Sequence, residues 1–593
     1  MPDTENIIID QTTTGELLKE AVEKYGDRVA LYFKGTEVTY DDFYELVCRT
    51  AKGLQEKGIG KGSKIGLFMP NTPQYPIFFF AAGLIGATVV NYESGTTQEK
   101  FDNQIKASDT DIIVTSDANG FLNIAESSMN KGLLKKVIVT PLGDFLPSRL
   151  RIASNIIDNI KRTFNISAKF LLPAPESENY HHFGSLIDNQ GDFDKADVSK
   201  DDLALLIYTS GTTSAPKGVM LSHGNLTANA EQIAMIFTKQ DDLDDDSLID
   251  PAKVGSVTAA IPFYHSFGMM AAMLSPIKMG RELSIVPNPR DLLDVIKTIQ
   301  TRSNELFAAV PLLLEKIANH PKVGKYVLSS LLQVISGGSA CAQSLKESFK
   351  NASQSSALRV LEGFGQSEAS PVLATETSLI NKPGSIGKPL PGTEVKIVDP
   401  DDYSKILAPG EKGLALFRGP QVMIGYYNQP ELTKEALTED GWLNTGDIMI
   451  QDEEGYLFHA GREKRIIIIN SHNINPEEVE TQFLKHPAIA QACVVSVQEG
   501  DREVAKAFVH VDPKVKLDER FLRKYLEDKL DNYEMPKYIE FTDEPLPEVG
   551  IGKPNYRALE DLAAEQMENG TISGVPKQTT QRRLFGGILH FGR

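Results

Sequence analysis

The fold is decided by one stretch of the sequence, Leu203-Ala-Leu-Leu-Ile-Tyr-Thr-Ser-Gly-Thr-Thr-Ser-Ala-Pro-Lys-Gly218. Its first part, Leu203–Ile207, is a short apolar run, which predicts a buried strand. Its second part is a loop of hydroxyl side chains and glycines that leads to Lys217. Hydroxyl groups, exposed backbone at glycine and an ammonium group are donors that bind phosphate oxygens. We therefore expect a strand followed by a phosphate-binding loop, with a plain Ser/Thr/Gly linker as the alternative.

This loop differs from a Walker A loop. A Walker A loop has Gly before its Lys and Ser or Thr after it, whereas here Pro216 precedes Lys217 and Gly218 follows it. The residues after the loop, Val219–Leu221, predict a short strand before the next helix. The phosphate site therefore belongs to another class of nucleotide-binding protein.

Strand-like apolar runs alternate with helix-like segments on both sides of this stretch, which is typical of an α/β fold. One buried helix is expected at Pro76–Gly86. Strands are expected at Lys64–Met69, Ala87–Tyr92, Asp111–Thr115, Lys136–Thr140, Leu203–Tyr208, Ser256–Ile261 and Leu332–Ser336. From about Lys382, turn signals separate short alternating strands, which predicts a small β-rich subdomain.

The composition of the 593 residues favours a globular enzyme over a nucleic-acid-binding protein. Asp and Glu number 80 against 61 Lys and Arg, a net charge of -19, which would repel phosphate backbones. The three cysteines, Cys48, Cys341 and Cys493, have no spacing that suits a zinc site or a redox pair. We expect no nucleic-acid partner and a reducing compartment.

The N-terminus lacks the positive charge of a signal peptide, since Met1 is followed by Pro, Asp, Thr and Glu. The longest apolar run, Ile77 to Val90, is shorter than the roughly 20 residues of a membrane span. These features predict a cytoplasmic protein.

Five further motifs follow in order along the chain. They are Gly337-Gly-Ser-Ala340, Gly363-Phe-Gly-Gln-Ser-Glu368, Trp442-Leu-Asn-Thr-Gly-Asp447, Gly461-Arg462 and Leu546-Pro-Glu-Val-Gly-Ile-Gly-Lys553. Together with the loop at 208–218, they resemble the motifs of the acyl-adenylate-forming superfamily, which includes acyl-CoA synthetases, luciferases and peptide-synthetase adenylation domains. The resemblance spans roughly residues 30 to 560.

The resemblance implies an ATP-binding site. Phe364 would flank the adenine, Ser367 would bond a phosphate, Asp447 would bind the ribose hydroxyls and Arg462 would contact ribose and phosphate. The full set of nucleotide-binding residues that it implies is Thr209, Ser210, Gly211, Thr212, Thr213, Lys217, Gly338, Phe364, Gly365, Ser367, Asp447 and Arg462.

The resemblance also assigns the catalytic residues. Glu368 would hold Mg²⁺, a hard cation that prefers carboxylate and phosphate oxygens. Lys553 would lie against the substrate carboxylate and the α-phosphate, with Lys217 on the phosphates. His265, in Ile261-Pro-Phe-Tyr-His-Ser-Phe-Gly268, would lie near the incoming acid, with a core histidine as the alternative. Gly419–Tyr426 matches a structural motif of the family, to which we assign a scaffold role.

The fold implied is a large N-terminal domain of stacked sheets and helices with a β-rich subdomain, and a small mobile α+β C-terminal domain. The expected boundaries are 1–464 and 465–569, with a tail at 570–593, and Arg465 as the hinge. The chain departs from the family pattern at Ser214, Arg465 and Ser471, where Gly, Asp and Gly are usual. The last two departures bear on domain rotation and on the acceptor of the acyl group.

The substrate class follows from one segment. Leu146, Leu150, Ile157 and Phe164 belong to an apolar stripe at helical spacing that basic residues flank. A comparable insertion occurs in bacterial long-chain fatty acyl-CoA synthetases. It is either a packed helix or a contact with the inner membrane face through 145–170.

We therefore expect a ligase that joins a medium- to long-chain fatty acid to coenzyme A, uses ATP and Mg²⁺, and forms an acyl-adenylate, as in the long-chain fatty acyl-CoA synthetases that the chain resembles. The alternatives are an acyl carrier protein as acceptor, another carboxylic acid as substrate, a luciferase-like activity, and a lipid- or nucleotide-binding protein without catalysis.

Overall fold

The computed structural model describes residues 9–118, 120–147, 176–209, 217–237, 255–377, 380–465, 467–469, 472–500, 502–511, 517–527, 529–530, 534–549 and 553–572. The chain divides into two compact units. The large unit comprises Met1–Lys396, Leu416–Thr445 and Glu454–Leu457, and the small unit comprises Ile397–Ala415, Gly446–Glu453 and Phe458–Arg593. The expected domain boundary at residue 465 and the expected tail stay predictions.

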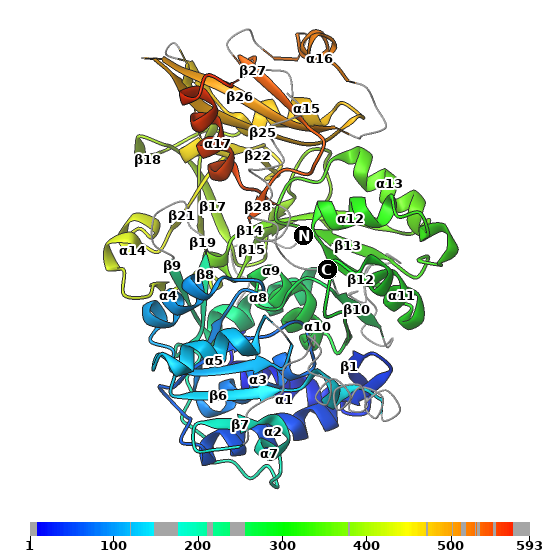
Figure 1. Cartoon of the computed structure of the whole chain (residues 1–593), viewed down its shortest axis with the longest axis vertical. Coiled ribbons are helices and arrows are strands. Elements are labelled where there is room, and N and C mark those ends of the chain that lie inside the picture. The colour runs from blue at the N-terminus through cyan, green and yellow to red at the C-terminus, as the bar shows by residue number, and fades with distance from the viewer. Residues whose placement is uncertain are drawn as a thin grey trace. The chain divides into compact units, whose positions relative to one another are not determined.

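The large unit contains an eight-stranded sheet that includes the strands on either side of the phosphate-loop sequence (Figure 1). Its order is β20 (Gly425–Tyr426), β9 (Lys217–Ser222), β8 (Leu203–Thr209), β4 (Thr88–Asn91), β3 (Lys64–Phe68), β5 (Ile112–Ser116), β6 (Lys136–Thr140) and β7 (Tyr180–His182). The strands from β8 to β7 run parallel, while β9 and β20 are antiparallel to their neighbours. Both strands expected around the phosphate loop, β8 and β9, are therefore present.

A nine-stranded sheet is the second layer of the large unit. Its order is β16 (Lys388–Pro389), β15 (Val372–Thr375), β14 (Arg359–Gly365), β13 (Gln333–Ser336), β12 (Leu306–Ala309), β10 (Ser256–Ala259), β11 (Glu282–Ile285), β1 (Val29–Phe33) and β2 (Thr36–Thr39). Its central strands are parallel. Strand β10 ends two residues earlier than expected, close to Pro262, which has no N–H for a sheet ladder.

Helices join and cover these strands, as expected for parallel sheets. The described part of the large unit contains the helices α1 (Thr14–Tyr25), α2 (Tyr40–Glu56), α3 (Gln74–Ile85), α4 (Gln98–Ser108), α5 (Leu122–Asn130), α7 (Phe183–Leu186), α8 (His223–Phe237), α9 (Ser266–Met269), α10 (Ser275–Lys278), α11 (Leu292–Arg302), α12 (Pro311–Ala318), α13 (Gln343–Ser353) and α14 (Pro430–Ala436). The expected buried helix is α3, whose Phe78, Phe79 and Phe80 all lie in the core.

A five-stranded sheet, in the order β18 (Asp402–Ile406), β17 (Glu394–Asp399), β19 (Lys412–Arg418), β21 (Leu443–Gln451) and β22 (Leu457–Arg462), forms the expected β-rich part. The residues of this sheet are divided between the two units. The small unit also holds β23 (Ile467–Ile469), β24 (His472–Ile474), β25 (Ile489–Glu499), β26 (Arg502–Val511), β27 (Tyr538–Thr542), β28 (Glu548–Val549) and β29 (Lys553–Pro554). Its helices are α15 (Pro476–Leu484), α16 (Glu519–Leu526) and α17 (Tyr556–Glu568). Helices α15 and α17 both pack on β25.

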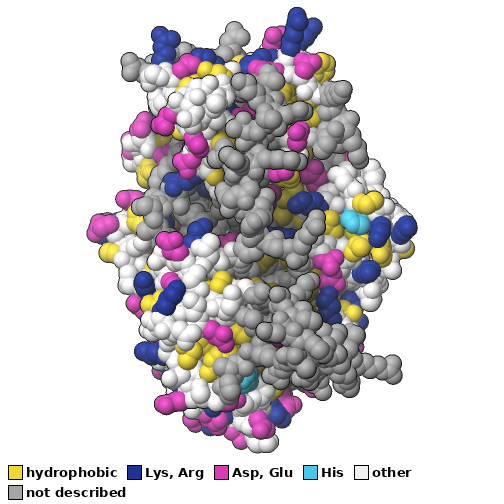
Figure 2. Space-filling model, viewed as in Figure 1, with side chains coloured by type: hydrophobic (Ala, Val, Ile, Leu, Met, Phe, Trp, Pro, Cys, Tyr) yellow, Lys and Arg dark blue, Asp and Glu magenta, His cyan; other side chains and the backbone are white. Residues whose placement is uncertain are grey.

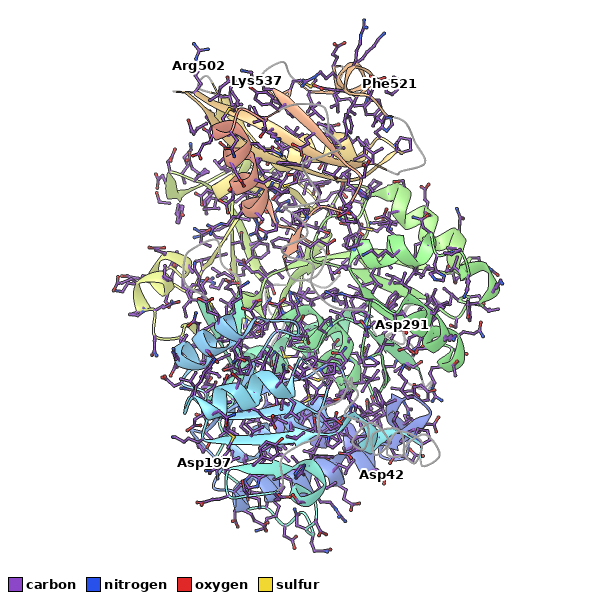
Figure 3. All side chains as sticks on the ribbon, viewed as in Figure 1. Asp42, Asp197, Asp291, Arg502, Phe521 and Lys537 are labelled. Atoms are coloured by element: carbon purple, nitrogen blue, oxygen red, sulfur yellow. The ribbon has the colours of Figure 1, made fainter. Side chains whose placement is uncertain are left out.

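Acidic and basic side chains are interspersed over the described surface in view (Figure 2). Charged residues such as Asp197 and Arg502 lie at the periphery, and Phe521 on α16 is an exposed apolar side chain (Figure 3). No helix within the described ranges is long and apolar enough to cross a membrane. The apolar stripe at 146–164 lies almost entirely outside the described residues, so its membrane role stays a prediction.

Candidate active site

Glu368, the expected magnesium ligand, is held by a tyrosine of another motif in the large unit. The hydroxyl of Tyr426 donates to Oε1 of Glu368 at 2.8 Å, and the backbone N–H of Met423 donates to the Glu368 carbonyl at 2.8 Å. Burial and the charge of Glu368 raise the pKa of Tyr426, so that its hydroxyl stays protonated and donates. The segment 423–426 thereby holds Glu368 at two points, with Tyr426 on its carboxylate and Met423 on its backbone carbonyl.

Lys217 contacts the ring of the same tyrosine. Its ammonium nitrogen is 5.1 Å from the centre of the Tyr426 ring, which suits a cation–π contact. Strand β20 brings Tyr426 to this position because it pairs with β9, with Tyr426 opposite Val219. The structure thus joins Lys217, Tyr426 and Glu368 into one cluster from three distant motifs.

The loop between β8 and β9 connects two strands that pair at Thr209 and Lys217. Ser210, Gly211, Thr212, Thr213 and Ser214 lie outside the described residues, as does the side chain of Thr209. Their phosphate-binding role stays a prediction.

The motif Ile261–Gly268, which contains His265, contacts the motif Gly363–Glu368. The hydroxyl of Ser266 lies 3.2 Å from that of Ser367, the expected phosphate ligand. His265 itself caps α9, because its Nδ1 accepts from the backbone N–H of Phe267 at 3.2 Å. That bond fixes the tautomer with the proton on Nε2 whenever the ring is neutral.

Two glycines of these motifs are required by the backbone. A Cβ on Gly365 would lie 1.8 Å from the carbonyl oxygen of Pro371, so that no larger residue fits there. Gly338 has a φ of 88°, a conformation that L side chains rarely adopt. Phe364, which directly precedes Gly365, is the aromatic side chain expected beside adenine. Its ring centre lies 6.0 Å from that of Phe417, and this contact holds the ring in place.

The remaining expected nucleotide ligands lie in the small unit. Asp447, on β21, has a side chain only 1% exposed, and its Oδ1 accepts from Nε of Arg462 at 2.9 Å. Nε2 of His459 lies 3.0 Å from the same oxygen. A buried carboxylate needs such partners because desolvating its charge is costly. Asp447 and Arg462 are therefore brought together, with His459 as a third member.

Arg465, the expected hinge residue, is bound within the small unit. Its guanidinium donates to Glu477 at 3.1 Å and to Glu480 at 2.7 Å, and it lies 5.0 Å from the centre of the Tyr556 ring. Burial alone would lower its pKa, but the paired carboxylates, above all Glu480, outweigh burial and raise it. The guanidinium is thus a fixed charge that orients two acidic side chains.

Lys553 lies on β29, opposite Val549 of β28. Its side chain lies outside the described residues, and so does Ser471. The catalytic role of Lys553 and the effect of Ser471 stay predictions.

Sequence reasoning missed several residues of these clusters. Tyr426 received only a scaffold role, and none of His459, Glu477 and Glu480 was singled out. His459 lies on a strand, three residues before Arg462. A histidine so close to a nucleotide-binding motif was the one feature of the sequence that could have identified it.

Comparisons with known proteins agree with this architecture. Residues 18–427 match the AMP-binding enzyme family, and residues 478–553 match the AMP-binding enzyme C-terminal domain. A long-chain-fatty-acid–CoA ligase of Bacillus subtilis (strain 168) is 33% identical over 94% of this chain and 96% of its own. A long-chain-fatty-acid–CoA ligase of Escherichia coli O157:H7 is 32% identical over 93% of this chain and 95% of its own.

Solved structures share the fold. The anthranilate CoA ligase AuaEII in complex with anthranoyl-AMP has a TM-score of 0.79 at 21% identity, covering 95% of this chain and 100% of that one. The O-succinylbenzoate coenzyme A synthetase MenE from Bacillus subtilis, in complex with ATP and magnesium ion, has a TM-score of 0.72 at 22% identity, covering 92% and 99%. With its family motifs in order and both family domains matched, the chain belongs to the AMP-binding, acyl-adenylate-forming enzymes.

Proposed function

We propose that the protein is an ATP-dependent fatty acid–CoA ligase that acts on long-chain acids through an acyl-adenylate. The observation that carries the proposal is the cluster of Lys217, Tyr426 and Glu368, which sets an ammonium group and an oriented carboxylate near one another for a metal-bound triphosphate. The long-chain class rests on the relatives named above, which are about one-third identical over nearly the whole chain.

Glu368 suits magnesium by the chemistry of its donor. Among the described residues, no group of three His, Cys, Asp or Glu side chains could hold a metal ion. Mg²⁺ commonly binds through one or two carboxylates and completes its shell with water and phosphate oxygens. Glu368 would hold the ion, which when bound supplies positive charge to the phosphates, and Tyr426 would keep the carboxylate aimed.

The first step joins the acid to the nucleotide. A carboxylate oxygen of the fatty acid attacks the α-phosphorus of ATP, and the bond from that phosphorus to the bridging oxygen breaks, which releases pyrophosphate. Lys217 and Lys553 would neutralise the charge that develops on the phosphates, and Ser367 would donate to a phosphate oxygen. Phe364, Asp447 and Arg462 would hold adenine and ribose, and His265 would lie beside the acid.

The second step transfers the acyl group. The thiol of coenzyme A gives its proton to solvent and attacks the carbonyl carbon of the acyl-adenylate, and the bond from that carbon to the phosphate oxygen breaks to release AMP. No side-chain nucleophile is needed. The main work of the protein is therefore to position the reactants and to stabilise charge.

The test is a product analysis by mass spectrometry. The purified full chain is incubated with Mg²⁺-ATP and a mixture of acids from acetate to oleate, with coenzyme A, with an acyl carrier protein, or with neither. We expect acyl-CoA from the long acids alone. A thioester formed on the carrier protein but not on coenzyme A would show that the acceptor is the carrier protein. Product from short acids alone would contradict the proposed long-chain substrate.

A variant pair connects this activity to the cluster. Glu368→Gln should abolish adenylate formation because it removes the charged oxygen ligand. Glu394→Gln removes an exposed carboxylate that pairs with Arg418 and serves as the control. Full activity of Glu368→Gln would contradict the assignment.

A further inference from the structure

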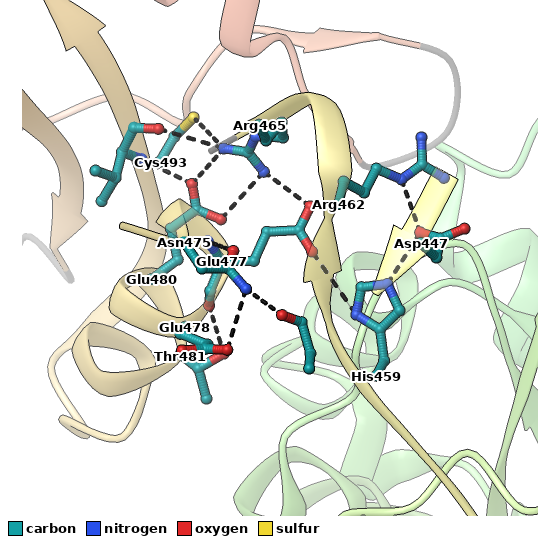
Figure 4. Close-up of polar contacts among 12 residues, drawn as sticks. Asp447, His459, Arg462, Arg465, Asn475, Glu477, Glu478, Glu480, Thr481 and Cys493 are labelled. Atoms are coloured by element: carbon teal, nitrogen blue, oxygen red, sulfur yellow. Dashed lines mark hydrogen bonds and ion pairs between the residues drawn. The ribbon is translucent and has the colours of Figure 1, made fainter. Parts of the chain in front are cut away.

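A chain of polar contacts runs through the small unit and ends at the carboxylate expected to bind ribose (Figure 4). Glu480 and Glu477 both accept from Arg465, Glu477 faces His459, and His459 faces Asp447. These residues come from the turn Glu463–Arg465, helix α15 and strands β21 and β22. The contacts connect elements that are separate in the sequence.

The imidazole of His459 lies between two carboxylates. Its Nε2 is 3.0 Å from Oδ1 of Asp447, and its Nδ1 is 3.7 Å from Oε2 of Glu477. Carboxylates accept hydrogen bonds, so that only the doubly protonated ring offers an N–H to both sides. The charged groups that face the ring are Asp447, Glu477 and, from its own strand, Arg462. Burial alone would lower the pKa of His459, but the hydrogen bond to Asp447 and the two negative charges outweigh burial and raise it.

Glu477 is itself fixed in place. It lies in the first turn of α15, where its backbone N–H donates to the Asn475 side chain at 3.1 Å. The guanidinium of Arg465 holds its other carboxylate oxygen at 3.1 Å. Arg465 is only 14% exposed and also donates to the Val494 carbonyl at 3.3 Å. Glu477 therefore gives His459 a rigid partner on the side away from Asp447.

We propose that His459, braced by Glu477, is a positioning residue that fixes the Asp447 carboxylate in the orientation in which it binds the nucleotide. The inference rests on the nucleotide-binding part of the proposed function. Arg462 binds the same oxygen of Asp447 from a side chain that is 44% exposed, so that His459, at 29%, is the more enclosed of the two partners. Both partners bind Oδ1, which restricts the rotation of the Asp447 carboxylate.

The experiment compares two substitutions that differ in which ring nitrogen they imitate. In His459→Gln the amide nitrogen takes roughly the place of Nε2 and can still donate to Asp447. In His459→Asn the amide is one carbon shorter and cannot reach it. The control, His510→Asn, changes a histidine of the same unit whose Nδ1 bonds the Thr542 carbonyl. AMP affinity by calorimetry and the KM for ATP in adenylate formation are measured from about pH 6 to about pH 9.

At the acid end, His459→Asn should weaken AMP binding and raise the KM for ATP by about tenfold, with a much smaller change in kcat. His459→Gln should recover part of this loss, and the control should match the wild type. The ratio of variant to wild-type KM should shrink as the pH rises, because only the wild-type ring loses its charge. A purely structural histidine would lower thermal stability in both variants without this pH-dependent ratio.

Equal AMP affinities and KM values in His459→Asn and wild type across the pH range would overturn the inference. A His459→Gln variant as impaired as His459→Asn would also overturn it, because the donor to Asp447 would then not matter. If the wild type binds AMP but forms no thioester, only the proposed ligase activity is contradicted. The AMP affinities of the variants still decide the role of His459.

Discussion

Replacing Tyr426 by Phe removes one hydroxyl group from the candidate active site and leaves the ring in place. The lost contact is the 2.8 Å hydrogen bond to Glu368, made by a side chain only 6% exposed. A hydrogen bond to a charged group contributes about 1.5–3 kcal/mol. If the whole contribution acts on the transition state, kcat/KM for ATP falls by roughly 10- to 100-fold.

The assay is ATP–pyrophosphate exchange with a fatty acid, measured as a function of magnesium concentration. Tyr426→Phe should need more magnesium for half-maximal exchange, because Glu368 is no longer held in one orientation. The contact between Lys217 and the ring is retained, which confines the change to the carboxylate.

The neighbouring tyrosine provides a matched control. Tyr427 donates to Asp109 at 2.8 Å on the surface, so Tyr427→Phe also removes a hydroxyl that bonds a carboxylate. This control should keep wild-type exchange. Identical magnesium dependence in Tyr426→Phe and wild type, with both proteins folded, would refute the reasoning.

Three further predictions concern the stability of the fold. Gly365→Ala should destabilise the large unit by at least about 2 kcal/mol, because its methyl group would overlap the Pro371 carbonyl, and thermal unfolding would measure the loss. Arg465→Met should destabilise the small unit by about 3 kcal/mol, because it leaves Glu480 nearly buried without its cation; an unchanged urea midpoint would contradict this. The raised pKa of His459 contributes stability that is complete below about pH 6.5 and is lost as the pH rises through that raised pKa, so the Tm difference between wild type and His459→Gln should shrink at alkaline pH.

Much of the sheet structure was predictable because short apolar runs in parallel sheets are buried on both faces. The strands Lys64–Phe68 and Lys136–Thr140 and the helix Gln74–Ile85 lie within two residues of their expected positions. Strand order was not predictable, since the placement of β10 between β11 and β12 depends on packing between segments distant in sequence.

The site residues were predictable where the functional side chain lies within a recognisable sequence motif. Glu368, Asp447 and Arg462 stand in sequence patterns that a family resemblance identifies. Tyr426 stands in the Gly419–Tyr426 motif, but its contact with Glu368 was not predictable, because it depends on the pairing of β20 with β9. The contact of Glu477 with His459 was not predictable either, because it depends on where helix α15 begins. Against the effect of burial, the carboxylates on both sides of the His459 ring raise its pKa, and spacing along the chain does not reveal these carboxylates.

The central claim, ligation through an acyl-adenylate, is tested most directly by following one oxygen atom. A long-chain acid labelled with oxygen-18 in its carboxyl group is converted with Mg²⁺-ATP and coenzyme A, and the masses of the products are measured by mass spectrometry. The account predicts acyl-CoA together with AMP that carries one labelled oxygen, because the carboxylate oxygen that attacks phosphorus leaves with AMP. Label in inorganic phosphate together with ADP would indicate an acyl phosphate and would contradict the account.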